Sequence, residues 1–578
     1  MAQRTNSNKN LSVEYGGFEG IDTRAHHSGG VQDALNLRIL PDGSLQKRQG
    51  YKCIYLAPYG VRAIWSGTIG GKFSCYFLSL NGVYRLNIST GETTLFAVIQ
   101  TSSGKAQFFY FRDALYLTDN KTIYKILDNA ASPITGYVPL FGKDWGTGYP
   151  GEINEPLNLL HRHARITYKI EENHSAYLPT LYPVSEIKAV YKNGELLSSD
   201  SYSFDTRFNT INIAGLETGD ALEADLTFEG EGDAELVSDL LSSPFAYVFG
   251  GINNSRLFMW GGESENTIFT STYVSRESLA EAEKHFPKCG HIYFCEGNQF
   301  TVGDGRYSIK ALTRHFDRLL ILTEGDAWIA DSSTCGLEEF PVMNVNSRIG
   351  CSSERGAVCI GNDPVSVGRG AIFRWTSDTD ELNECNAYSI SDEISDLLEP
   401  SFFKNAVAYA DELRGELWFC DAGGDGIVWI YNVKKKAWSR FSNIHATAFF
   451  DADGDVGFVG DSLICVFNDE YRADSKSLGN TASTPIEASL TSGVIDLGTP
   501  KAKRLKSMVL FADLDGGSIE TRIVSDRGEQ INAYLTSDAE HSPYSLRLHT
   551  HRMRSFSFTL LADGEERQTL RSLKIEAR

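Results

Sequence analysis

A hairpin pattern recurs along most of this chain and limits what it can fold into. Seven segments read as an apolar strand, a polar turn with Gly, Asn or Asp, and a second apolar or aromatic strand. This order of residues is typical of a β-hairpin. The segments are SCYFLSLNGVYRLNISTGE (74–92), RDALYLTDNKTIYKI (112–126), NSRLFMWGGESENTIFTS (254–271), FDRLLILTEGDAWIAD (316–331), GRGAIFRWTSDTDEL (368–382), LRGELWFCDAGGDGIVWIYNV (413–433) and DVGFVGDSLICVF (455–467).

Within each cluster the hairpins recur about every 40 to 50 residues, which is the length of a β-propeller blade. Aromatic residues make up 11% of the chain, with 53 Gly and only 5 Met, a balance that favours strands and tight turns over helical bundles. We therefore predict an all-β protein built on a β-propeller of six to eight blades. The N-terminal and last strands are expected to close one blade together. Helices are expected only at 276–286 and 391–405.

Two interruptions divide the chain further. Residues 143–237 open on a Gly/Pro-rich link and then alternate apolar and polar residues, with turns at KNGE and ETGD, which predicts a small inserted β-sandwich. Residues 471–486 are polar and read as a linker before a C-terminal β-sandwich-like domain at 487–578. The remaining parts are an N-terminal entry segment (1–58), the first blades (59–142) and the other blades (238–470).

The charge is acidic and unevenly spread. The 578 residues hold 54 Lys and Arg against 75 Asp and Glu, a net charge of −21. Such a balance argues against a protein that coats nucleic acid through a basic surface. Residues 501–578, however, hold 13 basic and 11 acidic residues, which leaves −23 for residues 1–500. The C-terminal segment therefore either docks onto an acidic neighbour or presents a solvated face.

Motifs for chemistry are missing from the sequence. It has no P-loop, HExxH, GxSxG, CxxC or sialidase-type SxDxGxxW motif. His161 and His163 stand beside Arg162 and Arg165, which would repel a cation, and the turn at 451–457 lacks the Gly and Glu positions of an EF-hand. We predict no catalytic residue, no cofactor and no metal site. The ten single cysteines, together with the lack of a signal peptide or an apolar run of membrane-spanning length, predict synthesis in a reducing cytoplasm.

The N-terminal segment carries a family resemblance. GGFEGIDTRAHHSGGVQDALNLRILPDGSLQKRQGY resembles the opening of phage tail proteins of the nozzle, tail-hub or packaged-DNA-stabilisation kind, which reads N-x-R, then DG-x-L-x-K-R-x-G, and runs into a propeller. The match rests on Asn36, Arg38, Asp42, Gly43, Leu45, Lys47, Arg48 and Gly50. EIKAVYKNGELLSSDSYSFDTRFNTINI is similar to a β-module of phage tail and fibre proteins, and GVIDLGTPKAKRLKSMVLFAD to C-terminal strands of such tail proteins.

The resemblance implies a non-enzymatic virion structural protein of the tail, in the tail tubular protein B-like family of short-tailed phages. Six copies would form a hub or nozzle ring below the portal and adaptor proteins, next to tail fibres or spikes. Double-stranded DNA would pass through this ring without specific binding and be retained there until ejection. Lys47, Arg48, Arg552 and Arg554 are the predicted assembly-interface residues. Two alternatives stay open: a tail-associated propeller glycosidase with a carboxylate pair in the central channel, and a receptor-binding protein.

Overall fold

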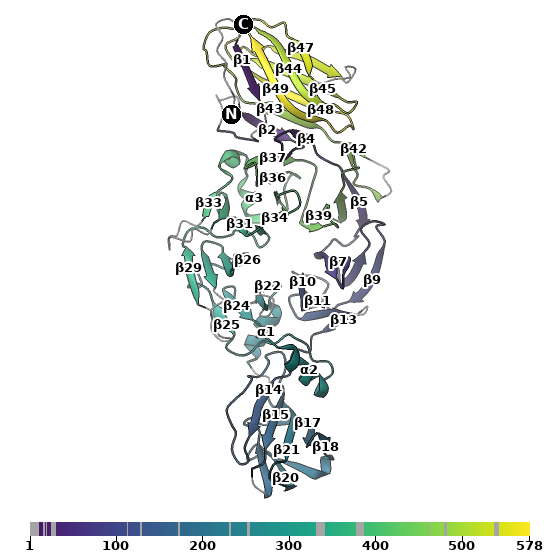
Figure 1. The fold of residues 1–578 in the computed structure, drawn as a ribbon, viewed down its shortest axis with the longest axis vertical. Coiled ribbons are helices and arrows are strands. Elements are labelled where there is room, and N and C mark those ends of the chain that lie inside the picture. Colours follow the sequence, from purple (N-terminus) through teal and green to yellow (C-terminus); the bar gives the residue numbers. More distant parts are fainter. Residues whose placement is uncertain are drawn as a thin grey trace.

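The computed structural model describes residues 11–15, 18, 20–24, 30–112, 114–127, 130–171, 174–230, 233–250, 255–330, 341–376, 387–460, 462–478, 483–536 and 543–578. Strands dominate these residues, and the all-β prediction is confirmed. Three parts follow one another along the molecule, a two-sheet domain at one end, a ring of sheets in the middle and a smaller two-sheet domain at the other end (Figure 1).

The ring consists, within the described residues, of seven antiparallel units of four strands. Their first strands contact one another in a closed cycle, from β6 through β10, β22, β26, β30, β34 and β38 back to β6. This arrangement is that of a seven-bladed β-propeller. The blades are β6–β9 (Ala63–Ile69, Lys72–Ser79, Gly82–Leu86, Thr93–Val98), β10–β13 (Gln107–Phe111, Ala114–Thr118, Ile123–Leu127, Ala130–Pro133), β22–β25 (Phe245–Phe249, Arg256–Trp260, Thr267–Thr270, Gln299–Thr301), β26–β29 (Ile309–His315, Arg318–Thr323, Ala327–Ala330, Val342–Asn346), β30–β33 (Ala357–Ile360, Asp363–Val367, Ile372–Trp375, Ala387–Ser389), β34–β37 (Ala406–Asp411, Glu416–Asp421, Val428–Asn432, Ala437–Phe441) and β38–β40 (Ala448–Asp451, Val456–Gly460, Leu463–Phe467).

An N-terminal strand completes the last blade. β5 (Tyr51–Leu56) pairs antiparallel with β40, so that Phe467 lies opposite Tyr51 and Leu463 opposite Leu56. A propeller closed in this way keeps its ring shut by main-chain hydrogen bonds between segments about 400 residues apart. The closing blade therefore contains strands from both halves of the chain, as the hairpin pattern predicts.

The insertion leaves the ring between the second and third blades. One sheet holds β14 (Leu140–Trp145), β15 (His163–Lys169), β17 (Val184–Lys192), β18 (Glu195–Leu196) and β21 (Ala221–Phe228), and the other holds β16 (His174–Pro179), β19 (Tyr202–Asp205) and β20 (Thr210–Leu216). A one-turn 3-10 helix, η1 (Ser199–Ser201), precedes β19. Ile166, Leu222 and Ile211 are among the fully buried side chains between the sheets, so the insertion has a hydrophobic core of its own.

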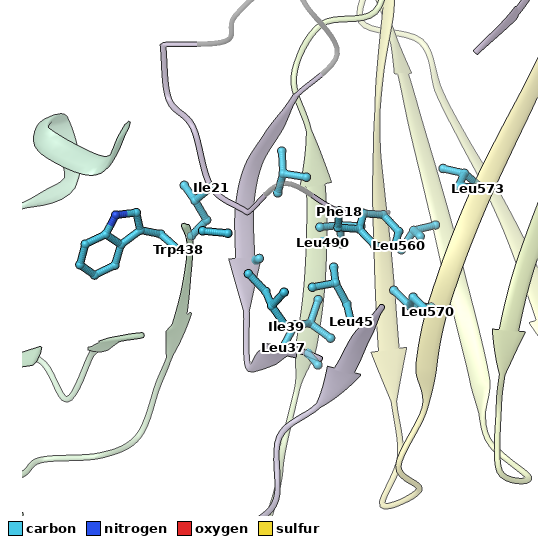
Figure 2. Close-up of a cluster of buried hydrophobic side chains, with 14 of the residues drawn as sticks. Phe18, Ile21, Leu37, Ile39, Leu45, Trp438, Leu490, Leu560, Leu570 and Leu573 are labelled. Atoms are coloured by element: carbon cyan, nitrogen blue, oxygen red, sulfur yellow. The ribbon is translucent and has the colours of Figure 1, made fainter. Parts of the chain in front are cut away.

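The C-terminal domain is built from both ends of the sequence. β1 (Leu11–Tyr15), β3 (Leu37–Ile39) and β4 (Leu45–Lys47) join β44 (Leu505–Asp513), β47 (Tyr544–Arg547) and β49 (Thr569–Ala577) in one sheet. β2 (Val31–Leu35) joins β43 (Ala488–Ser492), β45 (Ser518–Ser525), β46 (Gln530–Thr536) and β48 (Phe556–Asp563) in the other. Leu37, Ile39 and Leu45 pack with Leu490, Leu560 and Leu573 in a shared core (Figure 2).

The same N-terminal strands connect this domain to the propeller. β2 also pairs with β37, in parallel, at Leu35 and Arg440, so one sheet of the domain runs on into the sixth blade. Trp438 of that blade lies in the same hydrophobic cluster as Phe18 and Ile21 (Figure 2). The predicted linker forms a two-stranded ribbon of β41 (Ala473–Asp474) and β42 (Thr484–Pro485), and its residues 479–482 lie outside the described residues.

Helices are few among the described residues. α2 (Arg276–His285) begins at Ser275, whose side chain accepts a hydrogen bond from the Ser278 N–H, as the start signals predict. The second expected helical segment is split into the 3-10 helix η2 (Asp392–Leu397) and α3 (Pro400–Asn405). α1 (Ala234–Ser242) was not expected. In the part of the chain described here, no helix combines the length and the apolar character needed to cross a membrane.

Candidate functional site: the buried polar junction

The residues that carry the family resemblance gather where the propeller meets the C-terminal domain. Arg48, the residue after β4, is 2% exposed and lies at the centre of this site. Its Nη1 and Nη2 atoms donate to the two oxygens of Asp474, at 2.8 and 2.6 Å. The Asp474 carboxylate is itself 2% exposed, so the pair is shielded from water on both sides.

The other Arg48 donors are also used. Nε donates to Asn36 Oδ1 at 2.9 Å, and the remaining Nη hydrogens point to the carbonyl oxygens of Gln49 and Ser442 at 2.9 and 3.0 Å. A guanidinium offers five N–H donors, and all five have acceptors here. Arg48 therefore ties the N-terminal segment to the ribbon at Asp474 and to the loop after the sixth blade at Ser442.

Asn36 holds the second corner of this network. Its backbone φ is 53°, in the left-handed region that Asn tolerates better than most residues. Its amide nitrogen donates to Ser442 Oγ at 2.9 Å and to the Glu487 carbonyl at 2.7 Å, while its oxygen accepts from the Ser442 N–H at 2.8 Å. One short side chain thus links the propeller to the start of the C-terminal domain.

Arg38 forms a second buried ion pair nearby. Its Nε lies 3.1 Å from Glu416 Oε1, and both side chains are less than a tenth exposed. Its guanidinium also lies over the rings of Trp418 and Phe441, at 6.0 and 5.8 Å from their centroids. Burial raises the pKa of Glu416, and the Arg38 cation opposes this shift. The pair fixes β3 against the sixth blade.

Lys47 and Gly50 complete the part of the resemblance that lies in this junction. The Lys47 side chain is 1% exposed and its ammonium donates to the Gly564 carbonyl, 517 residues further along the chain. A Cβ on Gly50 would lie 2.1 Å from the Ala473 carbonyl oxygen, so only Gly fits where the segment passes the ribbon. Asn36, Arg38, Lys47, Arg48 and Gly50 therefore each have a structural task within one chain.

Two of the predicted assembly-interface residues lie in this junction. Lys47 and Arg48 were predicted as interface candidates because the N-terminal segment was expected to help build the ring. Both are buried and bonded to partners in their own chain, which argues against that role. Arg552 and Arg554 are exposed, in the segment between β47 and β48, and stay available to a partner.

The centre of the propeller holds a cavity of about 340 Å³ lined by all seven first strands. Small and apolar side chains make most of its wall, among them Ala63, Ala246 and Ala311. Among its described lining residues, Glu354 is the single carboxylate, and it pairs with Lys105. A glycosidase of the kind considered from sequence uses two carboxylates across the scissile bond, a pair this lining does not hold.

The histidine pair lies at the base of the insertion. The His161 and His163 rings are 5.0 Å apart, and the His163 N–H donates to His161 Nδ1. Burial, with His163 and Lys188 as neighbouring cations, lowers the pKa of His161 to about 4. Across the described residues, no group of three or more His, Cys, Asp or Glu is placed to hold a metal ion.

The acidic turn at 451–457 connects β38 to β39. Asp451 Oδ1 accepts a hydrogen bond from the Gly454 N–H at 2.8 Å, while Asp455 pairs with Arg414 at 3.2 Å and accepts from Asn468. The first is a local bond of a hairpin turn, and the other two join the turn to the sixth blade and to the residue after β40. Eight cysteines fall within the described residues; all eight are free, and all but Cys359 are buried, whereas Cys335 and Cys385 lie outside those residues.

Comparison with known proteins adds little about function. No family model and no curated protein matches the sequence. Among solved structures, the chain is similar to two crystal structures of the extracellular domain of BT4673 from B. thetaiotaomicron. One is described as part of a putative one-component system and the other as part of a putative hybrid two-component system. Both are 9% identical, with TM-scores of 0.39 and 0.38 over 91% and 90% of this chain. The chain spans 60% and 61% of the length of those chains. It is also similar to the AfRom2 CNH domain, with 6% identity and a TM-score of 0.35, covering 72% of this chain and 99% of that one. Likenesses this distant identify no function.

Proposed function

We propose that this chain is a non-enzymatic structural subunit of a phage tail, one of six copies in a hub or nozzle ring below the portal and adaptor proteins. The ring would serve as a conduit for double-stranded DNA and help to retain it until ejection. This function follows from the sequence resemblance at 36–50, and the neighbours it names are those of that family.

One observation carries the proposal. Five of the eight residues that carry the resemblance, Asn36, Arg38, Lys47, Arg48 and Gly50, lie in one buried junction, and each has a distinct steric or hydrogen-bonding task there. The short phrase at 36–50 thus supplies side chains that join the propeller to the C-terminal domain, and this shared structural task supports a shared architecture with the proteins that carry the phrase.

The joint suits a part that bears load. A ring around exiting DNA has to keep its shape while its domains are pushed apart. Buried, fully bonded ion pairs are poor stabilisers relative to apolar packing, but separating their partners is costly. Arg48–Asp474 is such a pair and holds the N-terminal segment to the ribbon, and the buried ion pair Arg38–Glu416 holds β3 to the sixth blade.

The charge distribution also fits a conduit. Residues 1–500 carry −23, and a wall of this sign repels the phosphate backbone at short range, so DNA would slide past without adhering. The expected geometry places acidic surface of the propeller or insertion toward the lumen. A ring whose lumen is lined mainly by Arg and Lys would contradict this part of the proposal.

Electron microscopy of the purified protein and of the phage particle tests the proposal. We expect six-fold rings with an open lumen, coaxial with the tail in the particle. A chain that stays monomeric at high protein concentration and is absent from the tail would overturn it. Release of sugars from host surface polymer, abolished by one carboxylate substitution, would instead establish the glycosidase alternative.

A further inference from the structure

One end of the C-terminal domain gathers cations from several segments. β44 begins there and pairs with the ends of β49 and β47, with Leu505 opposite Ala577 and Ser507 opposite Arg547. The segment after β47 returns to the same end, where Met553 bridges Lys503. We call this surface the basic end and define it by six exposed residues, Lys501, Arg504, Lys506, Arg547, Arg552 and Arg554.

A buried lysine holds this surface in place. Lys503 is 2% exposed, and its ammonium donates to the carbonyl oxygens of Asp496, Thr499 and Arg554. It thereby fastens the loop before β44 to the loop before β48. The Leu505 N–H further donates to Thr550 Oγ1 at 2.9 Å. The exposed cations therefore stand on a fixed base, so that little ordering entropy is lost when they meet a ligand.

Most charges of the basic end have no carboxylate partner among the described residues. In the described structure, Lys501, Arg504, Arg547, Arg552 and Arg554 form no ion pair. Some exposed arginines elsewhere do pair with a carboxylate, as Arg306 does with Asp304 and Arg369 with Glu324. The sequences 501–506 and 547–554 contain no Asp or Glu. Two acidic residues lie beside this surface: Asp526 Oδ1 accepts from the Arg554 N–H, and the pKa of Glu576 is lowered by its bond to Lys574 and further by the Lys506 cation.

The make-up of the surface indicates what kind of partner it fits. Stable protein interfaces have apolar or aromatic side chains at their centre. The large exposed apolar residues of this domain are Val494, Val524 and Tyr534, and none falls within 501–506 or 547–554. Binding to a phosphate backbone needs clustered cations and no such centre. We propose that the basic end binds the phosphate backbone of double-stranded DNA without reading its sequence.

This inference deepens the proposed function and rests on it, because it names the surface at which the subunit meets the DNA that the ring conducts. The −23 charge of residues 1–500 repels the same backbone. Only the basic end is then able to approach it closely. Each subunit would bind the DNA backbone at the basic end and repel it at its acidic surfaces. This combination would position the duplex in the ring without further contacts between the DNA and the acidic surfaces.

Fluorescence anisotropy with a labelled duplex of mixed sequence tests the inference on the full chain. We expect the wild type to bind at about 50 mM salt, with affinity falling at least about tenfold by about 200 mM. Arg552→Glu plus Arg554→Glu should weaken binding by roughly tenfold or more and flatten the salt dependence by about two contacts. Arg318→Glu plus Lys404→Glu, which changes the net charge equally at exposed sites of the propeller, is the matched control and should lose far less.

Three results would overturn the inference. The wild type does not bind the duplex at low salt; the control loses as much affinity as the Arg552 and Arg554 variant; or the latter variant keeps its DNA affinity but no longer forms rings. The last result would show that the basic end docks onto protein. If the protein forms rings but does not bind DNA, the inference is refuted and the proposed function stands. If the protein binds DNA through the basic end but forms no rings, the inference stands and the proposed function is refuted.

Discussion

Arg48→Met removes the cation at the centre of the junction and should be among the most destabilising single changes in the chain. It leaves the Asp474 carboxylate, 2% exposed, with one remaining side-chain donor, Asn443 Nδ2 at 3.0 Å. It also leaves Asn36 Oδ1 and the carbonyl oxygens of Gln49 and Ser442 without the guanidinium donors. Loss of one partner of a buried ion pair costs about 3–5 kcal/mol.

Urea unfolding followed by tryptophan fluorescence measures this cost, because Trp418 and Trp438 lie in the blade beside the junction. Hydrogen exchange should show the loss of protection starting in β2–β5 and the ribbon at Asp474. The double variant Arg48→Met plus Asp474→Leu removes both charges and should lose at least about 1 kcal/mol less than the sum of the single changes.

An exposed pair provides the control for the same experiment. Arg306 and Asp304 lie 3.2 Å apart with side chains about two thirds exposed, so Arg306→Ala should change the stability by less than about 1 kcal/mol. If Arg48→Met shifts the unfolding curve no more than Arg306→Ala does, the junction does not hold the two domains together in the way described.

Three further predictions concern other parts of the chain. Gly50→Ala places a Cβ 2.1 Å from the Ala473 carbonyl oxygen, and we expect a lower unfolding temperature with loosened packing of the ribbon, whereas Gly71→Ala, at a turn with open space, costs only its backbone strain. The pKa of His161 is lowered to about 4 from the usual value near 6.5, so His161 is protonated in the unfolded chain at a higher pH than in the folded protein. The folded state therefore loses stability as the pH falls from about 6.5 to 4, by up to about 3 kcal/mol. Urea midpoints compared across that pH range should show a smaller loss in His161→Gln than in the wild type. The pKa of buried Asp225 is raised to about 6, so its contribution has the opposite sign, present at low pH and lost as the pH rises through 6, and Asp225→Asn should flatten that part of the stability profile.

The local pattern of the sequence predicted the propeller well because a hairpin is a short-range structure. Six of the seven hairpin segments each contribute two strands to a separate blade, and the turn residues lie within a few positions of the strands they join. The segment at 368–382 contributes β32, and its residues 377–382 lie outside the described residues. The start of α2 at Ser275 was readable for the same reason. The expectation that the N-terminal and last strands close one blade agrees with the pairing of β5 and β40.

The junction was not readable in this way. Lys47 and Arg48 look like surface cations beside a turn, and the groups that bury them, the Gly564 carbonyl and Asp474, lie 517 and 426 residues away. The alternation of apolar and polar residues near Lys47 and Arg48 carries no information about partners so far away in the sequence. The basic end was visible only as a net charge of +2 over 501–578, because the strand order that brings Arg504, Arg547 and Arg554 together is a property of the sheet.

The pairing of β5 with β40 has a consequence for how the chain is made. During synthesis, residues 51–56 leave the ribosome long before residues 463–467 exist, and β2–β4 wait still longer for the strands at 488–577. Until then the early strands expose unpaired edges, the kind of surface that aggregates or recruits chaperones. Folding of this protein should therefore finish with a slow step in which β2–β5 pair with strands made late in synthesis. Nascent chains halted before residue 463 should have a propeller whose last blade is not closed.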